Sequence, residues 1–270
     1  MINEKPQLHQ SMIKMLYSCG EQFRRRYGAR FGWNDKEEII PPGVALIIGI
    51  ATHKSVEKNL AAKIEKGELL PTEEAMEIAH DEAIGLWQGD VLLTEEESQN
   101  AKKVKGDSVD ISVSLAGLHA RDLAPKLEPK SVERKWVINL EGFPFDLAGQ
   151  WDIEEDNGAI RDTKTSGKSP SQNDADSSEQ LSMYSLAKQI CDKEDAPALY
   201  LDVLIKTKTP KIITLKTRRT DDQRQILLRR IERAAEIIEK GAFTPANPQD
   251  WICSRRFCGY ALTCPFWSGK

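Results

Sequence analysis

Residues 149–165, with the sequence GQWDIEEDNGAIRDTKT, predict two antiparallel strands joined by a turn at Asp156-Asn157-Gly158. A three-residue loop with its glycine in the left-handed conformation places Asp152 directly opposite Asp162 on the neighbouring strand. The two carboxylates then leave the same face of the hairpin, about 5 Å apart at their Cβ atoms, and Lys164 shares that face. A two-residue Asn-Gly loop would instead send the two aspartates to opposite faces, so this prediction depends on the turn.

Two carboxylates held this close repel each other unless a positive charge lies between them. A divalent cation that prefers oxygen ligands, such as Mg²⁺ or Mn²⁺, suits that position. Such an ion can lower the pKa of a bound water, while Lys164 orients the attacking water or offsets developing negative charge. The alternative is a solvent-exposed strand face that carries two acids and a lysine without any function, and the motif alone favours that alternative.

The segments on both sides of the hairpin predict an α/β fold. Before the hairpin, the pattern of apolar residues predicts helices over residues 10–27, 45–66, 72–88 and 95–123, with a loop over 33–43. The predicted order from there on is strands 132–140, 143–155 and 159–165, loop 166–178, helix 179–190, strands 198–207 and 211–218, helix 221–241 and a tail over 244–270. This order indicates a single domain over residues 1–270 with a mixed central sheet flanked by helices.

Two of the predicted helices carry polar side chains that could serve the same site. His53 lies on the helix over 45–66, with Glu57 one turn later on the same face. A single histidine on a helix is more often a surface residue than a metal ligand. Gln180 and Tyr184 are also one turn apart, on the helix after the hairpin. They indicate either ordinary helix surface or side chains that position a phosphate group or the lysine.

Three cysteines lie close together in the tail, at Cys253, Cys258 and Cys264. A site of four thiolates needs one more cysteine, and the candidates are Cys19 and Cys191. Cys191 ends an apolar helix stripe, which favours an interpretation as a core residue. Four thiolates can hold either Zn²⁺ or a [4Fe–4S] cluster, and the alternative is a set of cysteines without any metal.

Basic residues gather at three places along the chain. They are Arg24, Arg25 and Arg26; Lys206, Lys208, Lys211, Lys216, Arg218 and Arg219; and Arg255 and Arg256. Such clusters can contact nucleic-acid phosphates without selecting a base sequence, and each one alone also fits an ordinary solvated surface. Together they indicate a DNA-binding track on an otherwise acidic protein.

The composition limits the class of protein. The chain has 270 residues and a net charge of −4, and its mean hydropathy is −0.49. Its longest apolar run, Val44–Ala51, is too short to cross a bilayer, and the N-terminal sequence lacks an apolar signal core. We therefore expect a cytoplasmic protein without a membrane partner. Five cysteines in such a chain favour metal binding or burial over a disulfide framework.

The order of these motifs resembles the PD-(D/E)XK nuclease superfamily, and within it the RecB-type branch, which includes the AddB nuclease domain and CRISPR-associated and phage exonucleases. The resemblance extends from Ser11 to Cys264 and implies a restriction-endonuclease-like fold. It rests on Gly49-x3-His53-x3-Glu57, Gly149-x2-Asp152, Asp162-Thr163-Lys164-Thr165 and Gln180-Leu181-x2-Tyr184. By position it implies that the metal ligands are His53, Asp152, Asp162 and the backbone carbonyl of Thr163. The resemblance further implies that Lys164 serves catalysis and that Gln180 and Tyr184 support the site. The position of Thr163 is often aromatic in that branch.

The same resemblance extends to the cysteines and to the biological role. It implies a [4Fe–4S] cluster held by Cys19, Cys253, Cys258 and Cys264, which ties the C-terminal tail to the first helix. Four residues separate the first tail pair here where two are usual, so Zn²⁺ remains the alternative. The implied activity is a Mg²⁺- or Mn²⁺-dependent deoxyribonuclease, with exonuclease favoured over endonuclease, in recombination, repair or phage DNA processing. The alternatives are a non-catalytic DNA-binding module and a structural subunit of a helicase–nuclease complex. Such a protein would act in the cytoplasm of a bacterium or a phage-infected cell, as a homo-oligomer or with a recombination or helicase partner.

Overall fold

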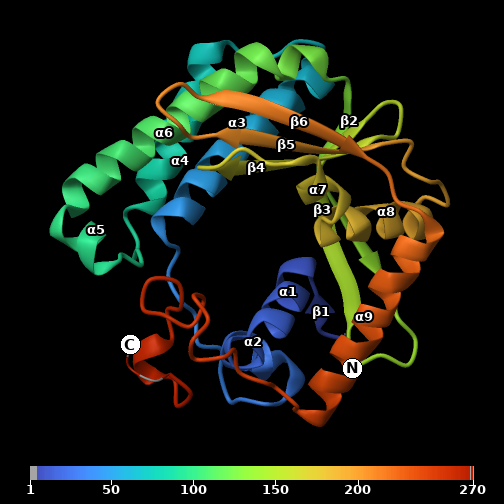
Figure 1. The fold of residues 1–270 in the computed structure, drawn as a ribbon. Coiled ribbons are helices and arrows are strands. Elements are labelled where there is room, and N and C mark those ends of the chain that lie inside the picture. The colour runs from blue at the N-terminus through green and yellow to red at the C-terminus, as the bar shows by residue number, and fades with distance from the viewer. Residues whose placement is uncertain (1–4, 268, 270) are drawn as a thin grey trace. The chain divides into compact units, whose positions relative to one another are not determined.

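The computed structural model describes residues 5–267 and residue 269 (Figure 1). The last residues of the predicted tail, 268 and 270, lie outside this description. Two compact units divide the chain. Unit 1 contains residues 1–41, 136–149 and 221–270, and unit 2 contains residues 42–135 and 150–220. Each unit combines segments that are distant in sequence, and the single domain over residues 1–270 stays a prediction.

The central sheet is mixed, as the sequence predicts. Its strands are β1 (Gln7–Leu8), β2 (Pro129–Ile138), β3 (Asp146–Glu155), β4 (Ile160–Ser166), β5 (Leu199–Ile205) and β6 (Lys211–Thr217). The strand order is β1-β3-β4-β5-β6, and β2 also pairs with β3. β3 and β4 are antiparallel, β4 and β5 are parallel, and β5 and β6 are antiparallel. The parallel pair is possible because the segment between β4 and β5 is long enough to cross over.

The turn of the hairpin has the geometry that the sequence analysis requires. Ile153 pairs with Arg161 and Glu154 with Ile160, which is the register of a three-residue loop. Gly158 has a φ of 82°, a left-handed conformation that glycine adopts without steric cost. The register therefore confirms that Asp152 and Asp162 lie opposite each other on neighbouring strands.

Unit 2 contains most of the helices. They are α3 (Val44–Lys66), α4 (Thr72–Leu86), α5 (Glu95–Gln99), α6 (Ala101–Asp122), the 3-10 helix Ala124–Lys126, α7 (Gln172–Asp176) and α8 (Glu179–Cys191). Figure 1 shows α3, α4 and α6 gathered on one face of the strands β4–β6, with α8 on the other. Val56 and Leu60 of α3 pack in the core with Leu127 and with Ile153 of β3. This packing fixes α3 against the strands that carry the two aspartates.

Two predicted segments of unit 2 differ from the structure. The predicted helix over 95–123 is interrupted at Asn100, whose backbone (φ −130°, ψ 33°) is not helical and separates α5 from α6. The short helix α7 lies within the predicted loop 166–178, and Ser171 and Asp174 begin it with a capping box. The capping box of α7 is a local side chain–backbone contact, which hydrophobic periodicity does not report.

Unit 1 contains α1 (Gln10–Ser18), α2 (Gly20–Tyr27), the 3-10 helices Gly28–Phe31 and Ala261–Thr263, and α9 (Asp221–Lys240). The predicted single helix over 10–27 is therefore wrong, because the chain breaks at Cys19. Cys19 has an extended backbone (φ −159°, ψ 102°), and the amide of Gly20 donates to the carbonyl of Thr244 at 2.7 Å. The break connects the N-terminal helices to the tail. No helix in the described part of the chain combines the length and the apolar character needed to cross a membrane.

Candidate active site

Asp152 on β3 lies at the centre of a cluster of polar side chains in unit 2. Its Oδ2 atom accepts a hydrogen bond from the backbone amide of Thr163 at 2.8 Å and lies 3.7 Å from Nδ1 of His53. Its Oδ1 atom accepts a hydrogen bond from the hydroxyl of Tyr184 at 3.2 Å. The two oxygens of this carboxylate therefore face different partners, and the backbone of β4 fixes its orientation.

Asp162 on β4 is almost fully buried, with 1% of its surface exposed. Its Oδ1 atom accepts hydrogen bonds from the ammonium of Lys164 at 2.7 Å and from the hydroxyl of Tyr184 at 3.4 Å. Burial raises the pKa of this carboxyl to about 7, and the nearby charge of Asp152 adds to the shift while Lys164 opposes it. Burial makes the ionised form of Asp162 unfavourable unless a positive charge lies next to it. The ammonium of Lys164 supplies such a charge from the solvent side.

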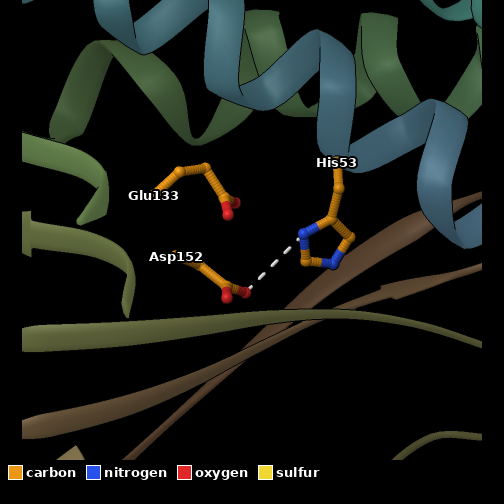
Figure 2. Close-up of side chains that lie close together, drawn as sticks. All are labelled: His53, Glu133 and Asp152. Carbon is orange, nitrogen blue, oxygen red and sulfur yellow. Dashed lines mark ion pairs between the residues drawn. The ribbon is translucent and has the colours of Figure 1, made fainter. Parts of the chain in front are cut away.

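A carboxylate that the sequence analysis missed completes the cluster. Ligand atoms of His53, Glu133 and Asp152 all lie within 4.8 Å of one another, and all three residues are half-buried. Figure 2 shows their side chains converging from α3, β2 and β3. Burial raises the pKa of Glu133 to about 7, and the charges of Asp152 and Glu57 add to this shift. No motif or spacing points to Glu133, because its position depends on how β2 pairs with β3.

The donor atoms of this cluster suit a divalent cation. Carboxylate oxygens are preferred by Mg²⁺ and Mn²⁺, and an imidazole nitrogen fits a transition metal such as Mn²⁺ better than Mg²⁺. Of the predicted ligands, His53 and Asp152 lie together with Glu133, while Asp162 adjoins Asp152 through the shared contact with Tyr184. The cluster therefore has the chemistry for metal-assisted attack on a phosphodiester.

The remaining predicted residues lie on the elements around the aspartates. Tyr184, on α8, is buried, and its hydroxyl also forms a hydrogen bond with the side chain of Gln180 one turn earlier. Thr163 is fully buried on β4, between Asp162 and Lys164. Trp151, next to Asp152 on β3, is fully buried and belongs to the core. The structure thus brings the side chains of His53, Asp152, Asp162, Lys164, Gln180 and Tyr184 into one connected set.

Comparison with known proteins agrees with this arrangement. The family model of the PD-(D/E)XK nuclease superfamily matches residues 7–265. The chain belongs to this superfamily. Its mixed sheet with flanking helices is the restriction-endonuclease-like fold that the sequence predicts.

Two solved structures resemble this nuclease. One is a candidate exonuclease from Eubacterium rectale, 13% identical, with a TM-score of 0.50, covering 90% of this chain and 84% of that one. The other bears the designation SSO0001, is 14% identical with a TM-score of 0.37, and covers 95% of each chain. No curated protein sequence matches the nuclease. At this level of identity the first structure supports the fold alone.

The cysteines of the tail meet Cys19 in unit 1. Cys19, Cys253, Cys258 and Cys264 line one small cavity, together with Gln22 and Arg25 of α2. The amide of Ala246 donates to the sulfur of Cys19, and Gln22 donates to the sulfur of Cys258. Cys191 lies elsewhere, at the end of α8 in unit 2, where it is exposed. Its interpretation as a core residue is wrong, because the apolar stripe of α8 ends before its last turn.

The basic residues of the nuclease differ in how accessible they are. Lys208, Lys211, Lys216 and Arg218 are exposed in unit 2, and Arg255 and Arg256 are exposed in the tail. Lys206 is half-buried, and burial lowers the pKa of its ammonium. Arg24 and Arg26 are half-buried, and Arg24 forms an ion pair with Glu21 at 2.8 Å.

Two of the predicted phosphate-contacting arginines are buried. Arg25 donates to Glu21, Glu38 and Thr263, and thereby joins α2 to the tail within unit 1. Arg219 donates to the carbonyls of Ala175 and Ser178 and to the hydroxyl of Ser182. Because their guanidinium groups serve internal contacts, we remove both from the set of candidate DNA-binding residues.

Proposed function

We propose that this nuclease is a Mg²⁺- or Mn²⁺-dependent deoxyribonuclease that hydrolyses phosphodiester bonds, most often from DNA ends. The observation that carries the proposal is the set formed by Asp152, Asp162, Lys164 and Tyr184. Two carboxylates on neighbouring strands, a half-exposed ammonium and a buried hydroxyl that contacts both acids fit phosphodiester hydrolysis. A solvated strand face would not need a buried tyrosine to connect its acids.

Each residue has a role that follows from its contacts. A divalent cation held by His53, Asp152, Asp162 and the Thr163 carbonyl would supply positive charge beside the phosphate and lower the pKa of the attacking water. Lys164, hydrogen-bonded to Asp162 yet half exposed, can reach a phosphate oxygen or orient the water. Tyr184 holds both carboxylates in place, and Gln180 fixes the Tyr184 hydroxyl.

We also propose that the nuclease acts preferentially at DNA ends. This preference is supported by the resemblance to RecB-type exonucleases, and the Eubacterium rectale protein bears an exonuclease name. On the same basis we propose a role in recombination, repair or phage DNA processing, in the cytoplasm of a bacterium or a phage-infected cell. A homo-oligomer or a complex with a helicase partner fits this role.

We further propose that the cysteine cavity holds a [4Fe–4S] cluster. Cys19, Cys253, Cys258 and Cys264 line one cavity in unit 1, and four thiolates can hold either a [4Fe–4S] cluster or Zn²⁺. The resemblance to iron–sulfur nucleases of the RecB type supports the cluster.

The tail also offers candidate contacts to DNA. Trp251 and Phe257 are 68% and 55% exposed, and their rings meet edge to face at 4.8 Å. The guanidinium of Arg256 lies over the ring of Phe257 at 5.5 Å, and Arg255 is exposed next to it. Aromatic rings and arginines side by side suit unpaired bases and phosphates. This supports Arg255 and Arg256 as contacts to a single strand.

The decisive experiment incubates the anaerobically purified protein with end-labelled DNA and Mg²⁺ or Mn²⁺, alongside Asp162→Ala. The proposal expects metal-dependent release of end label by the wild type and none by the variant, with DNA binding retained in both. Iron and sulfide analysis of the same preparation tests the cluster, and zinc in its place would correct only that part. Binding of DNA by the wild type without cleavage under any metal would favour the non-catalytic binding module instead.

A further inference from the structure

The carboxyl ends of β4 and β5 lie side by side in unit 2, just beyond Lys164 (Figure 1). The two strands are parallel, with Ser166 opposite Ile205, and the amide of Lys206 donates to the carbonyl of Ser166 at 2.8 Å. Because a strand rises about 3.3 Å per residue, the hairpin that joins β5 to β6 begins about 7 Å beyond Lys164. Ligands of α/β proteins often bind outside the carboxyl ends of parallel strands, so this edge is a candidate for contact with the substrate.

Three segments of unit 2 that approach this edge contain no acidic residue. They are residues 163–173 after the second aspartate, residues 203–220 around the hairpin, and residues 44–56 in the first half of α3. Val44 of α3 and Ile212 of β6 pack against the same core cluster, which brings the start of α3 close to the base of the hairpin. Lysines without nearby carboxylates give this edge a positive potential, and the positive end of the α3 dipole adds to it.

Lys206 carries a charge at this edge that no anion of the protein balances. Its side chain is half-buried, and no carboxylate in the described part of the chain forms an ion pair with it. Burial lowers the pKa of its ammonium, and no neighbouring charge opposes this shift. A half-buried ammonium without an anion lowers the stability of the free protein. Proteins commonly keep such a cost where the group serves a ligand, and the ligand here must be an anion.

Two exposed lysines extend the same edge. Lys168 follows β4 in a turn held by Ser166, whose hydroxyl accepts a hydrogen bond from the Lys168 amide at 3.0 Å. Lys208 lies in the hairpin, where the hydroxyl of Thr207 donates to the carbonyl of Thr209 at 2.8 Å. Neither lysine forms an ion pair within residues 5–267. Local hydrogen bonds thus order both turns, while their two ammonium groups stay available to a ligand.

We propose that Lys168, Lys206 and Lys208 bind neighbouring phosphates of the DNA strand that is cleaved, on one side of the phosphate at Lys164. This inference rests on the proposed function and assigns part of its substrate contact. Ammonium groups bind phosphates as point charges. The segments 163–173 and 203–220 contain no aromatic residue on which a base could stack. The edge therefore holds the sugar–phosphate backbone, and its contribution to binding should not depend on base sequence.

The test measures DNA binding without cleavage. The full-length protein in EDTA is titrated into labelled oligothymidine, and the dissociation constant is measured by fluorescence anisotropy at several salt concentrations. Each phosphate contact on a single strand contributes about 0.7 to the logarithmic salt slope. The double variant Lys206→Gln, Lys208→Gln should therefore lower the slope by about 1.4 and weaken binding roughly tenfold at low salt. A mixed-sequence strand of equal length should show the same losses. The control is Lys66→Gln, Lys126→Gln, because both lysines are exposed near the C-terminal end of α3.

Lys206→Met separates a binding role from a structural one. Because the ammonium is half-buried without an anion, this change should raise the Tm of the free protein while it weakens DNA binding. A fall in Tm, or an equal loss of affinity in the control, would overturn the phosphate contacts and leave the nuclease proposal intact. The expected losses of binding without cleavage by the wild type under any metal would keep the contacts and overturn the nuclease proposal. A wild type that does not bind DNA would overturn both.

Discussion

The ammonium of Lys188 donates to Oε1 of Glu154 at 2.8 Å, and both side chains are almost completely buried. Lys188 lies one turn after Tyr184 on α8, and Glu154 lies two residues after Asp152 on β3. Asp192 and Arg134 complete the network, and the guanidinium of Arg134 lies over the ring of Trp151 at 4.8 Å. The pair thus connects the helix that carries the tyrosine to the strand that carries the first aspartate.

Removing the lysine should therefore weaken the fold and the site together. Lys188→Met leaves Glu154 buried with Arg134 as its main cationic partner, and we expect a loss of about 2–3 kcal/mol of unfolding free energy. Urea denaturation measures this loss. Lys103→Met is the matched control, since Lys103 and Asp107 form an exposed pair, worth about 0.5 kcal/mol or less. Equal losses in the two variants would contradict a structural role for the buried network.

Tyr184→Phe tests the contact between the tyrosine and the two acids. The variant keeps the buried ring and removes only the hydroxyl that contacts Asp152 and Asp162. We expect kcat on end-labelled DNA to fall about tenfold, as is usual for a side chain that orients ligating carboxylates, while DNA affinity stays unchanged. Tyr200→Phe on β5 removes a hydroxyl that contacts neither acid and should keep wild-type kcat. A wild-type kcat in Tyr184→Phe would show that the hydroxyl does not position the acids.

The buried acid Asp162 should make the stability of the metal-free protein depend on pH. Its pKa is raised from 3.8 to about 7 by burial, so between these values the folded protein holds a proton that the unfolded chain has released. Folded-state stability from this group is thus present at acidic pH and lost as pH rises towards 7. We expect the unfolding free energy of the wild type relative to Asp162→Asn to fall from pH 5 to pH 8 in EDTA. A pH-independent difference would mean that Asp162 titrates normally.

Mn²⁺ should reverse that dependence. A divalent cation binds the ionised carboxylate, so its stabilising effect and the cleavage rate should both rise as pH increases through about 7. Thermal denaturation with and without Mn²⁺ at pH 6 and pH 8 measures the effect. An equal Mn²⁺-induced shift of Tm at both pH values, or no shift at either, would argue against Asp162 as a ligand.

The fold and part of the site can be predicted from local sequence, whereas the rest of the site depends on how distant backbone segments pair. The Asp-Asn-Gly turn sets the register of β3 and β4, so the positions of Asp152 and Asp162 could be predicted from a few residues. The position of Glu133 could not be predicted, because its backbone has a positive φ and the sequence has no glycine or asparagine there to indicate one. The helix break at Cys19 could not be predicted either. It depends on the hydrogen bond from the Gly20 amide to the distant carbonyl of Thr244 rather than on helix periodicity. Long-range backbone contacts are the information that a single sequence lacks.

Gly20, the first residue of α2 after the break at Cys19, packs closely against the tail. A Cβ atom at Gly20 would lie 2.7 Å from the amide nitrogen of Thr244 and 2.8 Å from the backbone of Phe243, which are rigid neighbours. Gly20→Ala should therefore push the tail away from the N-terminal helices, make the segment after α9 more sensitive to trypsin, and lower the content of the metal proposed for the cysteine cavity. Gly85→Ala in α4 has open space around it and should stabilise the protein by about 0.5–1 kcal/mol. If the tail of Gly20→Ala resists trypsin as well as that of Gly85→Ala, the close contact between Gly20 and the backbone of Phe243 and Thr244 does not hold the tail in place.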